Sequence, residues 1–154
     1  MAKQQFLIFF IDDEAFAVSA QDIVEILPMV NMNHIPKTED YVSGMMNYRG
    51  VMTPVIDLPM LLTTKPSQQK VCTRIIIINN QFHNVFKYTG LIAEKVIRTS
   101  QLDTDKFTKH TLVKNGVNYL GNIALDDSNE IQIISLDQLL PEEVNNIALT
   151  RHTG

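Results

Sequence analysis

The chain has 154 residues, of which 45% are hydrophobic and 19% are charged, proportions typical of a soluble globular protein that buries a real core. Its formal net charge of −4 argues against nonspecific binding to nucleic acid or to a membrane surface. The single cysteine, Cys72, allows no disulfide within the chain and favours a reducing compartment; we interpret it as a small apolar residue at a strand start. Because no apolar run is long enough to span a bilayer, we expect a cytoplasmic protein without membrane insertion.

The first part of the chain predicts a β-hairpin, a third strand and a short helix. Aromatic and β-branched residues 6–11 and the apolar residues 15–18 flank an acidic turn at 12–14, and residues 23–27 form another strand that Pro28 ends. Residues 39–42 are expected to form a short helix, with Thr38 as its N-cap.

A second hairpin follows, with Arg49-Gly50 at its turn. Gly50 supplies the backbone freedom that a tight turn needs, and Pro54, which has no N–H, places its strand at an edge or a bulge. A corner arginine can hold a partner's carboxylates or carbonyls in a fork. The equal alternative is a solvated turn arginine that binds nothing.

The remainder of the chain also predicts mostly strands. A polar connection at 63–69 leads to a buried strand at 73–78, one or two strands within 86–97, an irregular or helical turn at 102–110, and strands at 118–125 and 131–136 around a turn at 126–129. Pro141 opens a final helix. This pattern indicates an all-β barrel or sandwich.

A weak internal repeat supports two related barrels. Residues 55–62 match residues 133–140 at four of eight positions, and each segment follows a hairpin. We therefore expect each barrel to close with a strand and a leucine-rich turn.

The sequence contains no recognisable catalytic, phosphate-binding or metal-binding motif. The four histidines do not lie at metal-ligand spacing, and the acidic pairs at 12–13 and 126–127 fall in turns. We therefore predict no enzymatic activity and no cofactor. Two rivals stay open: a small β-barrel enzyme or ligand-binding domain, which a deep polar pocket would favour, and an oligosaccharide- or nucleic-acid-binding barrel, which the acidic charge and the few aromatics disfavour.

Several motifs together resemble the CheW family, the adaptors of bacterial chemotaxis arrays. The most specific are residues 44–50, Gly-Met-Met-Asn-Tyr-Arg-Gly, followed by Pro-Val-Ile-Asp-Leu at 54–58; the opening hairpin and residues 23–26, 90–96, 119–121 and 133–140 also match. The resemblance implies one CheW-like domain over residues 1–154, built from two five-stranded, SH3-like β-barrels with a C-terminal helix. We expect the boundary between the barrels near residues 63–72.

The resemblance also implies a function. Members of this family are non-catalytic adaptors that couple chemoreceptors, the methyl-accepting chemotaxis proteins, to a CheA-type histidine kinase. The expected partners are therefore the cytoplasmic tip of a receptor and the regulatory domain of the kinase. We expect the chain to meet them at receptor arrays or polar complexes beneath the membrane. An adaptor of a pilus-driven twitching system, or of another non-flagellar pathway, remains an alternative.

Residue by residue, the resemblance makes Arg49 the arginine of a receptor groove between the barrels. Ile23 and Glu25 match groove-side positions on a neighbouring strand. Tyr48 stands where the family usually has leucine, so it either places a hydroxyl at the groove edge or fills the same pocket with its ring. Four further residues are expected to be structural: Val55 and Ile56 in the core, and Asn47 and Gly50 in the turn. The kinase-facing surface is not assigned to residues.

Overall fold

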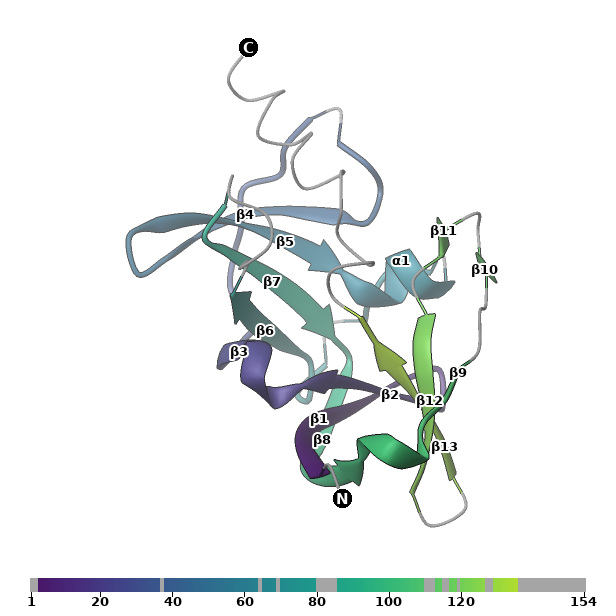
Figure 1. Cartoon of the computed structure of the whole chain (residues 1–154). Coiled ribbons are helices and arrows are strands. Elements are labelled where there is room, and N and C mark those ends of the chain that lie inside the picture. Colours follow the sequence, from purple (N-terminus) through teal and green to yellow (C-terminus); the bar gives the residue numbers. More distant parts are fainter. Residues whose placement is uncertain are drawn as a thin grey trace. The chain divides into compact units, whose positions relative to one another are not determined.

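The computed structural model describes residues 3–36, 38–63, 65–68, 70–79, 86–109, 113–114, 117–118, 120–126 and 129–135. These residues fall into two compact units, whose strands are labelled in Figure 1. The six-stranded unit takes the described residues of 3–22 and 95–135, and the five-stranded unit takes those of 23–94. Each unit is therefore built around its own β-sheet.

The sheet of the six-stranded unit has the order β8-β1-β2-β13-β12-β9. Its strands are β1 (Lys3–Ile11), β2 (Glu14–Ser19), β8 (Lys95–Asp103), β9 (Thr108–Lys109), β12 (Leu120–Asp126) and β13 (Asn129–Ile134). Two 3₁₀ turns, η1 (Ala20–Asp22) and η2 (Thr104–Lys106), and the short pair β10 (Val113–Lys114) and β11 (Val117–Asn118) complete its described elements. The expected strands at 6–11, 15–18 and 131–136 are confirmed to within a few residues.

The turn between β1 and β2 shows why this hairpin forms. Ile11 pairs with Glu14, which leaves Asp12 and Asp13 as a two-residue loop with φ of 50° and 66°. Positive φ at both positions is the type I′ geometry whose twist matches paired strands, and aspartate tolerates it better than most residues. Alternate residues of β1 then enter the core of this unit, where Phe6 and Ile8 pack with Ala17, Ile131 and Ile133.

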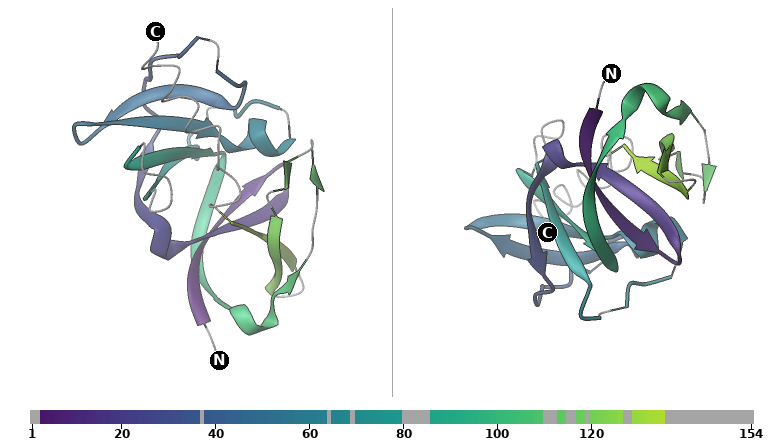
Figure 2. Two further views of the ribbon diagram at one scale, coloured as in Figure 1. Left: turned by 45° about the horizontal axis from the view of Figure 1, so that its top comes forward. Right: turned by 90° about the horizontal axis from the view of Figure 1, so that it is seen from below.

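The five-stranded unit has the sheet order β3-β6-β7-β5-β4, which can be followed in Figures 1 and 2. Its elements are β3 (Ile23–Pro28), β4 (Val42–Tyr48), β5 (Val51–Asp57), the helix α1 (Leu58–Thr63), β6 (Arg74–Asn79) and β7 (Tyr88–Ala93). The predicted buried strand is confirmed, since the four isoleucines of β6 are at most 1% exposed. Strand β5 runs parallel to β7, just as β13 runs parallel to β2 in the other unit.

The segment after β5 is a short helix rather than a leucine-rich turn. Asp57, at the end of the strand, accepts a hydrogen bond from the backbone N–H of Met60 through Oδ1 (3.3 Å) and two from Ser67 through Oδ2 (3.0 and 2.9 Å). The carboxylate therefore caps the helix. Although it is only 7% exposed, these three hydrogen bonds offset the free-energy cost of burying it.

The predicted helix at 39–42 is wrong. The hydroxyl of Thr38 donates to the carbonyl of Ile35 (2.9 Å) instead of capping a helix. The N–H of Val42 donates to the carbonyl of Glu39 (3.0 Å), which forms a single turn, and β4 begins at Val42. Pairing with a distant strand explains this outcome, because the carbonyl of Tyr41 accepts the N–H of Asp57 (2.7 Å).

Two other expectations can be compared with the structure. Strand β5 lies between β7 and β4 and is not an edge strand, whereas the alternative of a bulge has support, since the pairing of β4 with β5 shifts register between Val42 and Gly44, next to the pair of Met45 with Pro54. Pro54 comes just before the residues 55–57 that pair with β7, so its missing N–H interrupts no bond to that strand. The chain passes between the two units after residues 22 and 94 and not near 63–72, because β6 and β7 pair with β3 and β5 from before that stretch. The final helix expected from Pro141 lies outside the described residues.

Candidate functional site

The turn between β4 and β5 holds Arg49 at the end of a long hairpin, which Figures 1 and 2 show extending past the neighbouring strands. Tyr48 pairs with Val51, so Arg49 and Gly50 form a two-residue loop with φ of 51° and 81°. The side chain of Asn47 accepts the N–H of Gly50 (2.7 Å). Asn47 and Gly50 therefore hold the turn, as predicted, and the turn adopts the type I′ geometry that presents residue 49 at its corner.

Three side chains meet at this turn, and we call them the Arg49 corner: Glu25, Tyr48 and Arg49. The guanidinium Nη2 of Arg49 lies 2.7 Å from Oε1 of Glu25. The hydroxyl of Tyr48 donates to the same oxygen, also at 2.7 Å. The guanidinium carbon lies 5.2 Å from the centroid of the Tyr48 ring, within cation–π range. The Arg49 side chain is 68% exposed, so the guanidinium remains accessible to a binding partner.

The tyrosine of the corner belongs to the core as well as to the surface. Its ring packs in a buried cluster with Met46, Val55, Ile75, Ile77 and Ile92, and Tyr88 meets it edge to face, with ring centroids 5.2 Å apart. The hydrogen bond to Glu25 raises the pKa of the Tyr48 hydroxyl above its ordinary value, and burial raises it further. The phenol is therefore a neutral donor, and the Arg49–Glu25 pair has no net charge.

The structure brings three of the four predicted site residues together. Glu25, Tyr48 and Arg49 form the corner, whereas Ile23 is a half-buried apolar residue at the start of β3, opposite Ile78. The arginine was expected to stand open for a partner, and the structure shows it already paired with Glu25. The ring of Tyr48 fills a pocket of the core, as one of the two expected roles had it, and its hydroxyl donates to Glu25. Val55 and Ile56 are fully buried, as predicted.

The sequence pattern missed two exposed apolar residues on the strand that carries Glu25. Strand β3 is an edge strand of its sheet, and Val24 and Ile26, which flank Glu25, are 39% and 40% exposed. The alternating burial of β3 carries this signal, but it becomes readable only once the strand is known to lie at an edge. Tyr88, 40 positions away in the sequence, supports the Tyr48 ring through a ring–ring contact and is not part of the corner.

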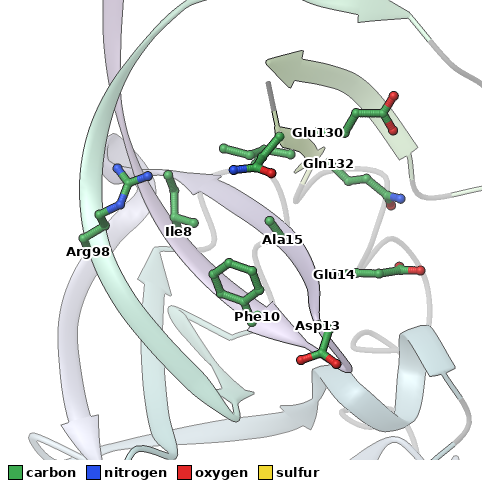
Figure 3. Close-up of a pocket in the computed structure, with 10 residues that line it drawn as sticks. Ile8, Phe10, Asp13, Glu14, Ala15, Arg98, Glu130 and Gln132 are labelled. Atoms are coloured by element: carbon green, nitrogen blue, oxygen red, sulfur yellow. The ribbon is translucent and has the colours of Figure 1, made fainter. Parts of the chain in front are cut away.

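The six-stranded unit contains a cavity of about 560 Å³. Its lining combines apolar and polar residues: Ile8, Phe10, Ala15 and Ile131, and Asp13, Glu14, Arg98, Asn129, Glu130 and Gln132. Figure 3 shows Arg98 on one side and Glu130 and Gln132 on the other. Two of its lining residues, Ile8 and Ile131, also belong to the core of this unit.

Other features of the described residues can be reported briefly. Across the described ranges, no group of three or more histidine, cysteine or acidic side chains is placed to hold a metal ion. No helix in the same ranges has the length and hydropathy needed to cross a membrane. Cys72 is exposed in a turn before β6, so the prediction of an apolar residue at the strand start is wrong.

Comparison with known proteins identifies the family. The CheW-like domain matches residues 5–144. The chemotaxis protein CheW of Helicobacter pylori is 26% identical over 139 residues, covering 90% of this chain and 82% of that protein. The chemotaxis protein CheW of Klebsiella aerogenes is 24% identical over 151 residues, covering 94% and 89%.

A solved structure supports the same conclusion for the fold. The crystal structure of the scaffolding protein TtCheW from Thermoanaerobacter tengcongensis superimposes with a TM-score of 0.79 at 25% identity, covering 91% of this chain and 94% of that one. The predicted all-β fold of two SH3-like β-barrel subdomains is thereby confirmed, with five strands in one sheet and six in the other. The chain belongs to the CheW-like domain family.

Proposed function

We propose that this chain is a non-catalytic adaptor that couples chemoreceptors to a CheA-type histidine kinase in chemotaxis signalling. In this proposal the cytoplasmic tip of a receptor docks at the Arg49 corner, and the regulatory domain of the kinase binds a second surface. The adaptor acts in the cytoplasm, at receptor arrays beneath the membrane.

The observation that carries the proposal is an exposed arginine at a rigid turn, bonded to an edge strand that also exposes two apolar residues. Arg49 is bonded to Glu25 of β3, and Val24 and Ile26 flank Glu25 with about two fifths of their surface exposed. Protein interfaces are dominated by a few apolar anchors and arginines of this kind. Family membership over residues 5–144 supports the adaptor role as a whole.

The chemistry of the corner fits an apolar helical partner that also offers polar groups. A guanidinium has five N–H donors, and among the described residues Arg49 uses its Nη2 group alone, on Glu25. The other N–H groups of the Arg49 guanidinium can donate to carbonyl or carboxylate oxygens of a binding partner. A partner that reaches around the edge of β3 can also bury Val24 and Ile26, which alternate with Glu25 along the strand. Such burial contributes about 25 cal/mol per Å² of apolar surface removed from water.

The proposal is tested by binding measurements with purified partners. The cytoplasmic fragment of a chemoreceptor and the CheA-type kinase from the same genome are each titrated with the wild-type chain, the Arg49→Glu variant and a control, Lys70→Glu. Lys70 is also exposed, in the same unit, and its replacement changes the net charge by the same two units. Circular dichroism reports whether each variant is folded.

We expect the wild-type chain and Lys70→Glu to bind both partners, and Arg49→Glu to keep its fold and its kinase binding while losing the receptor. Full receptor binding by Arg49→Glu would remove the site assignment. A wild-type chain that binds neither the receptor fragment nor the kinase would remove the proposed function itself.

A further inference from the structure

We propose that Tyr48 is a positioning residue that sets the affinity of the Arg49 corner by holding Glu25 in place. The inference rests on the proposed function, because the affinity in question is that for the receptor tip. It assigns the hydroxyl of Tyr48 a role that acts through Glu25 and Arg49 and not through direct contact with the partner.

The geometry shows why a tyrosine at this position differs from any purely apolar residue. The Tyr48 ring is fixed in the core of its unit at 4% exposure and by its edge-to-face contact with Tyr88. Its hydroxyl therefore projects from a rigid base, and it donates to Oε1 of Glu25 at 2.7 Å. A neutral donor to a carboxylate is a strong hydrogen bond, so the Glu25 side chain is held at one place.

The ion pair alone would not hold Arg49 in this way. The two side chains are 68% and 34% exposed, and exposed pairs are weak because water screens them and because two long side chains must give up rotamer freedom. The hydrogen bond from Tyr48 already restricts the rotamers of Glu25, so that forming the ion pair costs less side-chain entropy. Since Arg49 bonds to the very oxygen that Tyr48 holds, the guanidinium is preorganised before any partner arrives, and preorganised groups bind more tightly.

Two other roles for the hydroxyl predict different results. If it touched the partner directly, removing it would weaken binding whether or not Glu25 is present. If it were needed only for the fold, its removal would change stability but not the mobility of Arg49. A double-mutant cycle separates these cases, because it measures whether two residues act through each other.

The first experiment measures binding of a receptor cytoplasmic fragment by calorimetry to the wild-type chain, Tyr48→Phe, Glu25→Ala and the double variant. We expect Tyr48→Phe to weaken binding about 3- to 10-fold, the loss typical of one hydrogen bond. In the Glu25→Ala background the same change should matter by less than about 2-fold, since Glu25 transmits the effect. Tyr88→Phe, which removes the hydroxyl of the neighbouring ring, is the matched control and should bind as the wild type does.

The second experiment needs no partner. NMR relaxation of the Arg49 side-chain nitrogens in isotopically labelled protein should show an ordered guanidinium in the wild type and in Tyr88→Phe, and a more mobile one in Tyr48→Phe. Unchanged Arg49 order in Tyr48→Phe, or an equal loss of binding in both Glu25 backgrounds, overturns the proposal. If the wild-type chain does not bind the receptor fragment, the receptor-docking part of the proposed function fails, while the NMR result still decides whether Tyr48 holds Arg49 in place.

Discussion

Replacing Arg49 by asparagine separates the two things that this residue does, because it removes the guanidinium and leaves a residue that suits the turn. Arg49 has a φ of 51° and Gly50 a φ of 81°, a backbone in which asparagine followed by glycine is the favoured pair. Tyr48 still donates to Glu25 in this variant, so the carboxylate keeps a hydrogen-bond partner.

The expected change in the free energy of unfolding is small. The exposed Arg49–Glu25 pair, with side chains 68% and 34% accessible, contributes about 0–1 kcal/mol, and an exposed cation–π contact at 5.2 Å contributes about 0.5–1 kcal/mol. Against these losses, a left-handed residue other than glycine or asparagine costs about 1–2 kcal/mol, most of which asparagine relieves. The terms nearly cancel, so Arg49→Asn should lie within about 1 kcal/mol of the wild type.

Urea denaturation measures the stability, with Arg49→Ala as the control that loses the same contacts but keeps the strained backbone. We expect Arg49→Ala to be about 1 kcal/mol less stable than Arg49→Asn, and both to lose receptor binding. Equal stability of the two variants would refute the argument from turn strain. A loss above about 2 kcal/mol in Arg49→Asn would show that Arg49 is structural, since that exceeds what the two exposed contacts can supply.

Two further predictions concern stability. Gly44→Ala should lower the free energy of unfolding by about 1–3 kcal/mol, as measured by urea denaturation. A Cβ at this position would lie 2.5 Å from the carbonyl oxygen of Asn33 and would disturb the two backbone hydrogen bonds between Asn33 and Met45. A change below about 0.5 kcal/mol, the usual value for a surface substitution, would contradict this prediction. Above pH 10, stability should fall more steeply for the wild type than for Tyr48→Phe: the pKa of Tyr48 is raised in the fold, so its contribution is complete below the unfolded pKa of about 10 and is lost as the pH rises through the folded pKa. Parallel stability–pH curves for the two proteins would be inconsistent with a protonated Tyr48 donating to Glu25.

The elements that sequence predicted well are those whose cause is local. Residues 75–78 are β-branched and apolar in an unbroken run, and such a run stays buried wherever the strand is placed. The turns at Asp12-Asp13 and Arg49-Gly50 were placed correctly because each is a polar or glycine-bearing break between two apolar runs. In these cases the residues of the segment itself determine its secondary structure.

The elements that sequence missed depend on distant pairing. Residues 39–42 have an acidic, helix-like start, but the bond from Asp57 to Tyr41 draws them toward a strand. The polar stretch at 63–72 looked like a boundary, yet β5 before it and β7 after it are paired in parallel. Hydrogen bonds across a sheet decided both outcomes, and local propensity is routinely overridden by such tertiary pairing.

The Arg49 corner combines both kinds of information. The family resemblance named Glu25, Tyr48 and Arg49, but positions 25 and 48 are 23 residues apart, and no local pattern places two donors on one carboxylate oxygen. Because Arg49 is bonded to this oxygen, its electrostatic effect on a partner differs from that of the unpaired arginine expected from the sequence. A lone arginine would attract an acidic partner from a distance, whereas a paired one presents no net charge and has little long-range pull. In the proposed complex, recognition at this corner therefore depends on the fixed positions of its donors, and for that reason we propose that a hydroxyl that holds one carboxylate governs how tightly a partner binds.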